Sequence, residues 1–526
     1  MIKRIMSLGL SLCAAATVFP LPADQGARLD THQIILRLKD DGVRRIQAVR
    51  HNEVVPDISL PDGRPLIFVR PFDGNGVVVR LPEAVSLQEA QAIAAQLVAD
   101  SSVVSAQADK RMYPALVPND PRYPNQWNLF EDAGGIRMQG AWDRETGSAA
   151  GVIAQLDTGI IPHVDLDAGR VLPGYDFFSG GLSNLNTELD NDPVLGDPVG
   201  RDNNPTDPGD ATVDNECEPG SSGVNSSWHG LSVAGVMVAK SDNTIDIAGI
   251  DFAARLLPVR VLGKCGGSVS DVADAIRWAA GLSVAGVPAN PTPARVINMS
   301  LSGAGSCTQV EQDAINAAVD AGAVVVVSAG NEDVDVATQS PANCQKVVTV
   351  GAMLRDGSRA PYSNSGEAVD LSAPGGLMLN NPNDGILVLS NNGTTSAGQL
   401  DITGRISGSS FSTAQASAVA SLMLAVNSSL SSSQVRDILI LTTRAFPDAG
   451  CNTGCGSGIL DADAALAGAA DPASVLPVKA NTGGGGGGCT VAAARISVFD
   501  PLLLLLVVST ARRSWRKRKH LSPPVR

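Results

Sequence analysis

The 526-residue sequence predicts an α/β fold, in which a mostly parallel sheet carries helices on both faces and follows a small α+β region. Two observations predict it. From about residue 150 onward, short apolar runs alternate with segments whose apolar residues recur at helical spacing. Before residue 115, strand-like alternation of apolar and polar residues surrounds one amphipathic helix instead. The chain is also too long for one small domain.

The first segment is typical of a secretory signal peptide. Two basic residues precede an apolar run over residues 5–16, and small residues follow the run. Cleavage after Ala16 and cleavage after Ala23 both fit, and we assign residues 1–23 to the signal. A buried core helix is the alternative, but the segment is terminal and short. The chain is therefore expected to be exported.

Residues 24–115 form the α+β region. We expect a helix over residues 86–99, where Ser86 and Glu89 fit a capping box. Alternating apolar residues predict strands over residues 33–38, 76–81 and 103–109. From the residues alone, a permanent small domain and a removable segment both remain open.

Residues 116–470 carry the main sheet. The apolar runs predict strands over residues 152–156, 255–261, 295–300, 324–327 and 347–350. The helical pattern predicts helices over residues 229–240, 268–281, 308–321, 410–427 and 431–442. Strands that alternate with helices in this way favour a parallel sheet that is covered on both faces.

The helix that begins near Ser410 attracts attention because of its first turn. Gly408, Ser409 and Ser410 come just before a long helical run, and one buried face is expected from the apolar residues Phe411, Ala414, Ala418, Leu422 and Val426. A serine in the first turn lies among unpaired N–H groups at the positive end of the helix dipole. Negative charge that develops near its oxygen is stabilised there. A plain N-cap is the alternative interpretation.

Three other stretches favour a chemical role. Asp157 ends an apolar strand before a glycine, which is where open α/β sheets place site residues. His229 begins a helix of small residues, and Asn331 follows a buried strand and a glycine. Singly, each has a structural explanation as a turn former or a helix-end residue. Together with Ser410 they give the order Asp, His, Ser that is found in subtilisin.

These stretches resemble the catalytic blocks of secreted bacterial subtilisin-like serine proteases, the subtilase family, over residues 119–466. Further matches lie at residues 297–301, 360–364 and 369–375. The resemblance implies that Ser410 is the nucleophile and that His229 is the base, held by Asp157. Asn331 would form the oxyanion hole together with the backbone N–H of Ser410. The implied activity is that of a serine endopeptidase that cleaves proteins through an acyl-enzyme, with broad specificity.

The resemblance also implies a substrate site. Residues 300–303 and 328–332 would line the primary pocket, with Gln339 near its floor and Glu332 at its rim. The expected substrate-binding residues are Ser300, Leu301, Ser302, Gly303, Ala329, Gly330 and Gln339.

Several positions depart from the family pattern. Ser409 stands where the family usually has Thr, and Ala414-Gln415 stand where it usually has Pro-His. Leu231-Ser232 replace Thr-His after the catalytic histidine, and Ser302 replaces a frequent Gly. These departures bear on the rate and the pocket shape, since every triad residue and Asn331 are present.

Two stretches are candidates for calcium. An acidic insertion could hold Ca²⁺ or be a solvated loop, and it contains Asp190, Asp192, Asp197, Asp202, Asp207 and Asp210. By resemblance, a second site is expected to take side-chain oxygens from Asp165 and Asn243. Backbone carbonyl oxygens would come from Ser241, Ile245 and Ile247, and Gln126 is a further candidate ligand.

Eight cysteines are present, including Cys13 in the signal and Cys489 near the C-terminus. The six between them are an even number in an exported chain, which favours disulfides over metal or redox roles and allows fifteen pairings. Resemblance to exported subtilases suggests Cys217–Cys265, Cys307–Cys344 and Cys451–Cys455, of which only the last is also suggested by proximity.

The C-terminal end is a separate part. Residues 471–490 form a Pro/Ala/Gly linker, and residues 491–526 combine an apolar helix with a basic cluster. This tail resembles the sorting signals of some Gram-negative bacteria, which hold an exported protein in the inner membrane until a membrane protease releases it. A permanent single-span anchor is the alternative, although the apolar run is short. The net charge of −14 argues against nucleic-acid binding.

By resemblance, residues 24–115 are expected to be an inhibitory prosegment. Its last strand would lie in the substrate groove, and cleavage would fall between about Arg111 and Asn119. The expected product is a monomeric, self-processed enzyme at the cell surface or outside the cell. The main alternative is a weak or inactive subtilase-fold surface protein that binds other proteins.

Overall fold

The computed structural model describes residues 30–39, 49–60, 62–72, 74–109, 116–180, 201–379, 381–447, 450–451 and 453–477. The chain divides into residues 1–477 and residues 478–526, and the described residues all belong to the first unit. Several expectations lie outside the described residues: the signal peptide, cleavage within residues 110–115, the tail beyond residue 477, and Cys13, Asp190, Asp192, Asp197 and Cys489.

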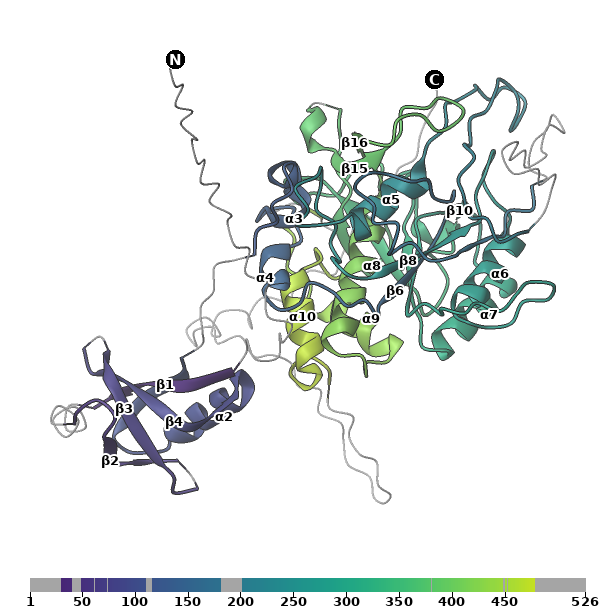
Figure 1. The fold of residues 1–526 in the computed structure, drawn as a ribbon. Helices are drawn as coiled ribbons and strands as arrows, with labels where there is room; N and C mark the ends of the chain where they lie inside the picture. Colours follow the sequence, from purple (N-terminus) through teal and green to yellow (C-terminus); the bar gives the residue numbers. More distant parts are fainter. Residues whose placement is uncertain are drawn as a thin grey trace, which may run out of the picture. The chain divides into compact units, whose positions relative to one another are not determined.

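The N-terminal region is an antiparallel sheet with one helix (Figure 1). Helix α2 (Leu87–Leu97) begins after Ser86, whose hydroxyl oxygen accepts a hydrogen bond from Glu89 N. The five strands have the order β2-β3-β4-β1-β5, with bounds β1 Asp30–Leu38, β2 Val54–Ser59, β3 Pro65–Phe72, β4 Gly76–Ser86 and β5 Val103–Ala108. The sequence predicted β1, β4, β5 and the helix. It missed β2 and β3.

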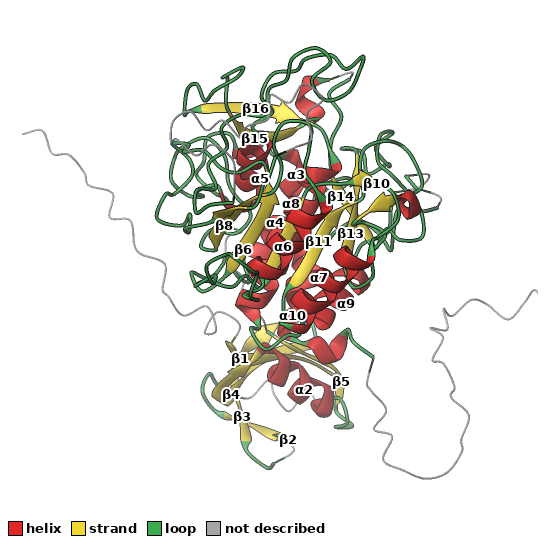
Figure 2. Ribbon diagram, turned by 90° about the vertical axis from the view of Figure 1, so that its right-hand side faces the viewer, coloured by secondary structure: helices red, strands yellow, loops and turns green. Residues whose placement is uncertain are grey.

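The main sheet has seven parallel strands in the order β14-β13-β11-β9-β6-β8-β7. Figure 2 shows β6, β11 and β13 of this sheet running between helices. The strand bounds are β6 Val152–Asp157, β7 Tyr175–Asp176, β8 Arg255–Arg260, β9 Val296–Met299, β11 Val324–Ser328, β13 Val348–Met353 and β14 Leu371–Pro374. The predicted fold class is confirmed. The two edge strands β7 and β14 were not predicted, because neither contains an apolar run: their sequences are Tyr-Asp and Leu-Ser-Ala-Pro.

Helices cover both faces of this sheet. Helices α6 (Val269–Ala279) and α7 (Gln309–Asp320) pack in one buried cluster with Val152, Ala154 and Leu156 of β6. Helices α5 (His229–Val238), α8 (Ser409–Val426), α9 (Ser432–Leu441) and α10 (Ala462–Ala470) pack in another cluster with Ile153. Since alternate residues of β6 enter different cores, every residue of this strand is buried, as expected for a parallel sheet.

Helix α8 corrects one expectation. The sequence predicted a single buried face, but all residues from Ser409 to Leu424 are buried. The reason is that α8 lies in the middle of its layer, where it contacts β9, β11, β13 and β14 as well as α5 and α10. Small residues such as Ala416 and Ala420 fill the positions that would otherwise face solvent.

Short elements complete the described chain. Helices α3 (Trp127–Phe130) and α4 (Met138–Trp142) precede β6, and strand β10 (Gly303–Ala304) pairs with β12 (Gln339–Ser340). Strands β15 (Ile386–Ser390) and β16 (Ile402–Ile406) form a hairpin before α8. Single 3-10 turns are η2 Tyr123–Asn125, η3 Val336–Thr338, η4 Pro382–Asp384 and η5 Pro472–Ser474. In the described part of the chain, no helix has both the length and the apolarity that crossing a membrane requires.

Candidate active site

Asp157 and His229 are brought together at the carboxyl end of the sheet. Asp157 is the last residue of β6 and is only 1% exposed. Its Oδ1 lies 2.7 Å from Nδ1 of His229, and the same oxygen accepts a hydrogen bond from Thr158 N at 2.8 Å. The hydrogen bond from Thr158 N fixes the carboxylate at the strand end, and the carboxylate in turn fixes the imidazole ring of His229.

Helix α5 is anchored to the same strand at its first turn. Gln155 of β6 donates from Nε2 to the carbonyl of Gly230 at 2.7 Å, and Gly230 N donates to Thr158 Oγ1 at 3.1 Å. A side chain at position 230 would collide with the carbonyl oxygen of Gly159, so this position requires glycine. His229 is therefore held between its helix and the end of β6.

The candidate nucleophile opens α8. Ser410 is the second residue of the helix and is 7% exposed. Its Oγ donates to the carbonyl of Ser300 at 3.3 Å, and Ser300 Oγ donates back to the carbonyl of Ser410 at 2.9 Å. Among the described residues, the hydroxyl of Ser410 makes no hydrogen bond to His229. The ring of the next residue, Phe411, has its centroid 6.1 Å from that of His229.

Asn331 is oriented by the residue before the nucleophile. Its Oδ1 accepts hydrogen bonds from Ser409 N at 2.9 Å and from Ser409 Oγ at 2.8 Å. The Ser409 hydroxyl is buried, and it also lies 2.6 Å from the hydroxyl of Ser328. The amide oxygen is therefore engaged, while Nδ2 of Asn331 lies near the helix start, 3.9 Å from a Cβ placed on Gly408, and donates to none of the described residues.

Carboxylates surround the imidazole of His229. Burial opposes its protonation, but the charge and hydrogen bond of Asp157 outweigh burial and raise the pKa of His229 above its ordinary value. Asp210 and Asp207 act in the same direction. Burial itself raises the pKa of Asp207 to about 6, although Thr158 donates to its Oδ2 at 2.7 Å.

The expected substrate-binding residues border two cavities. One, of about 430 Å³, is lined by His229, Ser300 and Asp210 among others. The second, of about 450 Å³, is lined by Leu301, Ser302 and Gly303. The two segments expected to line the primary pocket approach each other, since a Cβ placed on Gly330 would lie 3.1 Å from Ser302 Oγ.

The remaining pocket residues lie deeper. Ala329 is fully buried, and Gln339 is 6% exposed in β12, whose partner strand begins at Gly303. Glu332 turns its carboxylate back toward the chain, where Oε2 accepts from Asn331 N at 2.8 Å and from Asn364 Nδ2 at 2.7 Å.

The departures from the family pattern have structural explanations here. Gln415 is fully buried and donates from Nε2 to the carbonyls of Pro374 and Phe411, which ties α8 to β14. Ser232 donates to the carbonyl of Leu389 at 2.9 Å. Buried polar groups need such partners.

The expected calcium residues also converge. Asp165 is fully buried, and its two oxygens accept from Asn243 Nδ2 at 2.8 Å and from Ile247 N at 3.0 Å. Burial, together with the nearby charges of Asp120 and Asp246, raises the pKa of Asp165 to about 7, against the opposing hydrogen bonds from Ile247 and Asn243. The Oε1 of Gln126 accepts from Ala248 N instead.

The donor set at this loop is suited to a hard cation. The carbonyl oxygens of Ser241, Ile245 and Ile247 accept no hydrogen bond from the described residues. Together with a buried carboxylate, free carbonyl oxygens are the ligands that Ca²⁺ prefers.

The cysteines pair as the resemblance suggested, as Cys217–Cys265, Cys307–Cys344 and Cys451–Cys455. The first disulfide lies in the wall of the cavity beside His229. A salt bridge between Lys264 and the buried Glu216 joins the same two segments.

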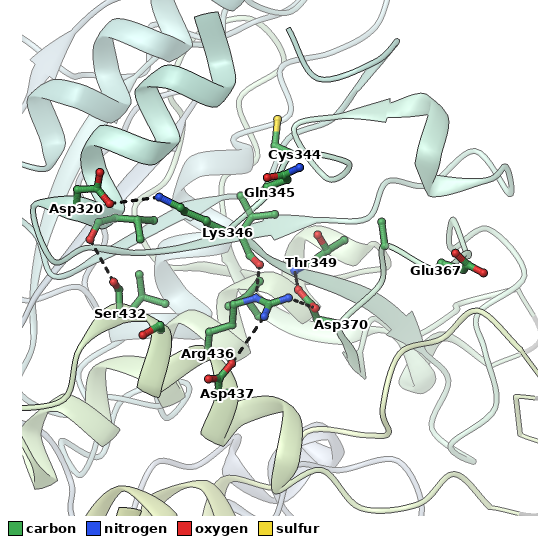
Figure 3. A pocket seen from close by; sticks show the side chains of 16 residues that line it. Asp320, Cys344, Gln345, Lys346, Thr349, Glu367, Asp370, Ser432, Arg436 and Asp437 are labelled. Atoms are coloured by element: carbon green, nitrogen blue, oxygen red, sulfur yellow. Dashed lines mark hydrogen bonds and ion pairs between the residues drawn. The ribbon is translucent and has the colours of Figure 1, made fainter. Parts of the chain in front are cut away.

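Figure 3 shows a further cavity, of about 690 Å³, that no triad residue lines. Its charged groups compensate one another: Arg436 pairs with Asp370, and Lys346 pairs with Asp320. We assign it no role in the chemistry of the site.

Sequence reasoning missed the part that Gln155 and Thr158 play in holding the site, and it named Ser328 and Asp210 only as a pocket residue and a calcium candidate. Gln155 could have been identified from the sequence, because it is a polar residue inside an otherwise apolar strand. The contacts of Ser328, Thr158 and Asp210 join positions far apart in the chain, so no local sequence pattern predicts them.

The fold and the site define an α/β protein with an Asp-His-Ser constellation and a nearby amide donor. A family model described as "Subtilase family" matches residues 149–458. The chain belongs to the subtilase family.

Individual relatives agree with this assignment. The chain is similar to "Extracellular protease" of Xanthomonas campestris pv. campestris, with 43% identity over 74% of this chain and 64% of the relative. It is also similar to "Extracellular basic protease" of Dichelobacter nodosus, with 37% identity over 76% of this chain and 64% of the relative. The chain thus spans about two thirds of the length of either relative.

A solved protease structure from Pseudoalteromonas arctica is 45% identical, with a TM-score of 0.62. The match covers 67% of this chain and all of that structure.

Proposed function

We propose that the chain is an exported serine endopeptidase that hydrolyses peptide bonds of proteins through an acyl-enzyme. The observation that carries the proposal is the 2.7 Å contact between Asp157 and His229, set beside Ser410 at the start of a helix. Two relatives named as extracellular proteases support both the activity and the export.

The chemistry follows from the geometry. Ser410 Oγ attacks the scissile carbonyl carbon while His229 Nε2 takes its proton, and Asp157 stabilises the imidazolium without accepting a proton itself. Asn331 Nδ2 and Ser410 N donate to the oxygen that becomes negative. His229 then protonates the leaving amine, and water releases the acyl group by the reverse proton path.

One rearrangement is required before attack. The Ser410 hydroxyl now donates to the carbonyl of Ser300, and it must rotate about χ1 to reach His229. In free enzymes such hydrogen bonds are often long or misaligned, and they form in the complex with substrate.

Four further proposals concern the whole chain. The region before residue 116 acts as an inhibitory prosegment that the enzyme removes itself. Ca²⁺ stabilises the loop around Asp165 and Asn243, where a buried carboxylate and free carbonyl oxygens support a cation. The C-terminal tail holds the exported protein at the inner membrane until a sorting protease releases it. The mature enzyme is a monomer.

A fluorophosphonate probe tests the activity directly. The probe reacts only with an activated serine, so it should label Ser410 in the purified protein and fail to label Ser410→Ala. His229→Ala should also remain unlabelled, since it lacks the base. A wild-type protein that resists the probe while folded would favour the alternative, an inactive family member that binds other proteins.

A further inference from the structure

The residue before the candidate base has an unusual backbone. Trp228 has φ 50° and ψ 35°, in the left-handed region that bulky side chains rarely adopt. Its side chain is 1% exposed. Such a conformation persists only where surrounding contacts hold it, and here it sets the direction in which His229 enters α5.

Trp228 is packed in the hydrophobic core, and the hydrogen bonds that hold its indole and the segment before it come from one loop. The indole Nε1 donates to the carbonyl of Gly393 at 2.7 Å. Two residues earlier, Ser226 donates from its backbone N to the carbonyl of Thr394 at 2.8 Å. Consecutive carbonyls of the loop over residues 391–400 therefore fix the segment that leads into the candidate base.

The same loop is braced internally. Asn391 is 8% exposed, and its Oδ1 accepts from Gly393 N at 2.8 Å and from Gly398 N at 2.6 Å. Its Nδ2 donates to the carbonyl of Gln399 at 2.8 Å. One buried side chain thus closes the loop and holds the Gly393 carbonyl in place.

The strands that carry the loop rest on the same helix. Ser232 of α5 donates to the carbonyl of Leu389 in β15. A Cβ on Gly235 would lie 2.6 Å from Cγ of Leu389, which shows how closely the strand and helix approach. The hairpin β15–β16 and α5 therefore form one packed unit around the candidate base.

We propose that Trp228 is a positioning residue for His229, and that the carbonyl of Gly393 at the tip of the β15–β16 hairpin holds it there. The indole N–H and the left-handed backbone together fix the distance between the imidazole and Asp157. This inference rests on the proposed protease function and adds a second support to the base, separate from β6.

Trp228→Phe tests the proposal, because it keeps an aromatic ring and removes only the indole N–H and part of the ring. Misplaced catalytic groups lose rate steeply, so kcat should fall about tenfold. KM should change less than about twofold, because the hydrogen bond that the substitution removes goes to Gly393 and not to the expected pocket residues 300–303 and 328–332. The variant should be produced from the full chain and compared after maturation.

Trp278→Phe is the matched control. Trp278 is likewise buried and donates from its indole to a backbone carbonyl at 2.7 Å, that of Pro288, but it packs in α6 against Tyr175 and Phe177. It should lower the unfolding temperature as Trp228→Phe does and leave kcat unchanged. Equal kcat in both variants would overturn the proposal.

The pH profile separates positioning from stability. His229 faces the carboxylates of Asp157, Asp207 and Asp210, and contact with Asp157 raises its pKa. A ring that is released from Asp157 titrates at lower pH, so the acid limb of kcat/KM should move to lower pH in Trp228→Phe. An unchanged acid limb would contradict the proposal.

Asn391→Ala provides a second approach that leaves α5 intact. If the loop acts through Trp228, this variant should lower kcat, and the double variant with Trp228→Phe should be little slower than the slower single variant. If the two substitutions lower kcat independently, so that the loss in the double variant is the product of the two single losses, the loop does not act through Trp228 and the proposal is overturned.

Failure of the proposal and failure of the protease function remain distinguishable. In residues 116–477 the histidines are His163 and His229, so NMR titration can follow His229 without turnover. An inert wild-type protein with a lowered His229 pKa in Trp228→Phe would refute only the protease function. An active wild-type protein whose His229 pKa is the same in the variant would refute only the positioning.

Discussion

At the scale of single residues, the site depends on hydroxyl groups that orient other groups. Ser409 uses one oxygen to reach the carbonyl of Gly330, the amide oxygen of Asn331 and the hydroxyl of Ser328. A threonine could offer the same hydroxyl, so the departure at this position preserves the contact that matters. The amide of Asn331 is thereby fixed before substrate arrives.

Asn331→Ala and Ser409→Ala should differ in severity. Asn331→Ala removes an oxyanion donor and should lower kcat about 10²–10³-fold, the cost of such a loss in subtilisin, a relative in this family. Ser409→Ala only loosens that donor and should cost less, about tenfold. Ser412→Ala is the control, because its hydroxyl on the same helix donates to the Ala373 carbonyl and not to Asn331. Steady-state kinetics would contradict this account if the two substitutions raised KM and left kcat unchanged.

The charge around His229 predicts the pH dependence. The base must be neutral, and its raised pKa keeps it protonated to a higher pH than ordinary histidine, near 6.5. Activity should therefore fall with decreasing pH through a pKa above that value. Asp210→Asn removes one of the raising charges, so the acid limb should move to lower pH. Asp320→Asn, on the exposed end of α7, should leave the limb unchanged. If the acid limb of Asp210→Asn lies at the same pH as that of the wild type, the charge of Asp210 does not raise the pKa of His229.

At the scale of elements, sequence reasoning succeeded where a pattern is local. The strand ending at Asp157 and the helices beginning at His229 and Ser410 follow from apolar periodicity and small residues at helix starts. The edge strands β7 and β14 were missed because they lack the apolar run that marks β9 and the other central strands. The contacts of Ser409 with Ser328 and of Trp228 with Gly393 join distant segments, so only the folded chain brings them together.

The loop over residues 241–247 is an element whose stability should respond to a cation. A ligand that binds only the folded state at 100 times its Kd stabilises by about 2.7 kcal/mol, so EDTA should lower the unfolding temperature of the mature protein. Asp165→Asn should abolish that response, while Asp167→Asn, in an exposed turn nearby, should retain it. Identical melting curves of the wild type with and without EDTA would contradict the calcium proposal.

At the scale of the whole molecule, the start of the catalytic region is tied to that same loop. Asn119 Oδ1 accepts from Thr244 N, Asp120 accepts from Asp242 N, and Arg122 pairs with Asp246. These contacts hold the chain just after the expected cleavage region, so cleavage there would leave the new N-terminus attached to the domain.

Self-processing is testable with the nucleophile alone. Ser410→Ala removes one oxygen and should fold, but it should accumulate as a precursor that retains the region before residue 116. A tethered peptide bond has a high effective concentration, so wild-type cleavage should be intramolecular and independent of protein concentration. N-terminal sequencing after expression in a protease-deficient host gives the answer. Maturation of Ser410→Ala at the wild-type position would mean that another protease cuts the chain.

The burial of helix α8 on every side also limits how this protein can evolve. An ordinary surface helix accepts substitutions readily on the face that meets water. From Ser409 to Leu424 no such face exists, so each replacement must fit a closed space. A replacement in the nucleophile helix therefore needs buried partners, as Gln415 finds in the carbonyls of Pro374 and Phe411, whereas exposed loops accept changes without such compensation.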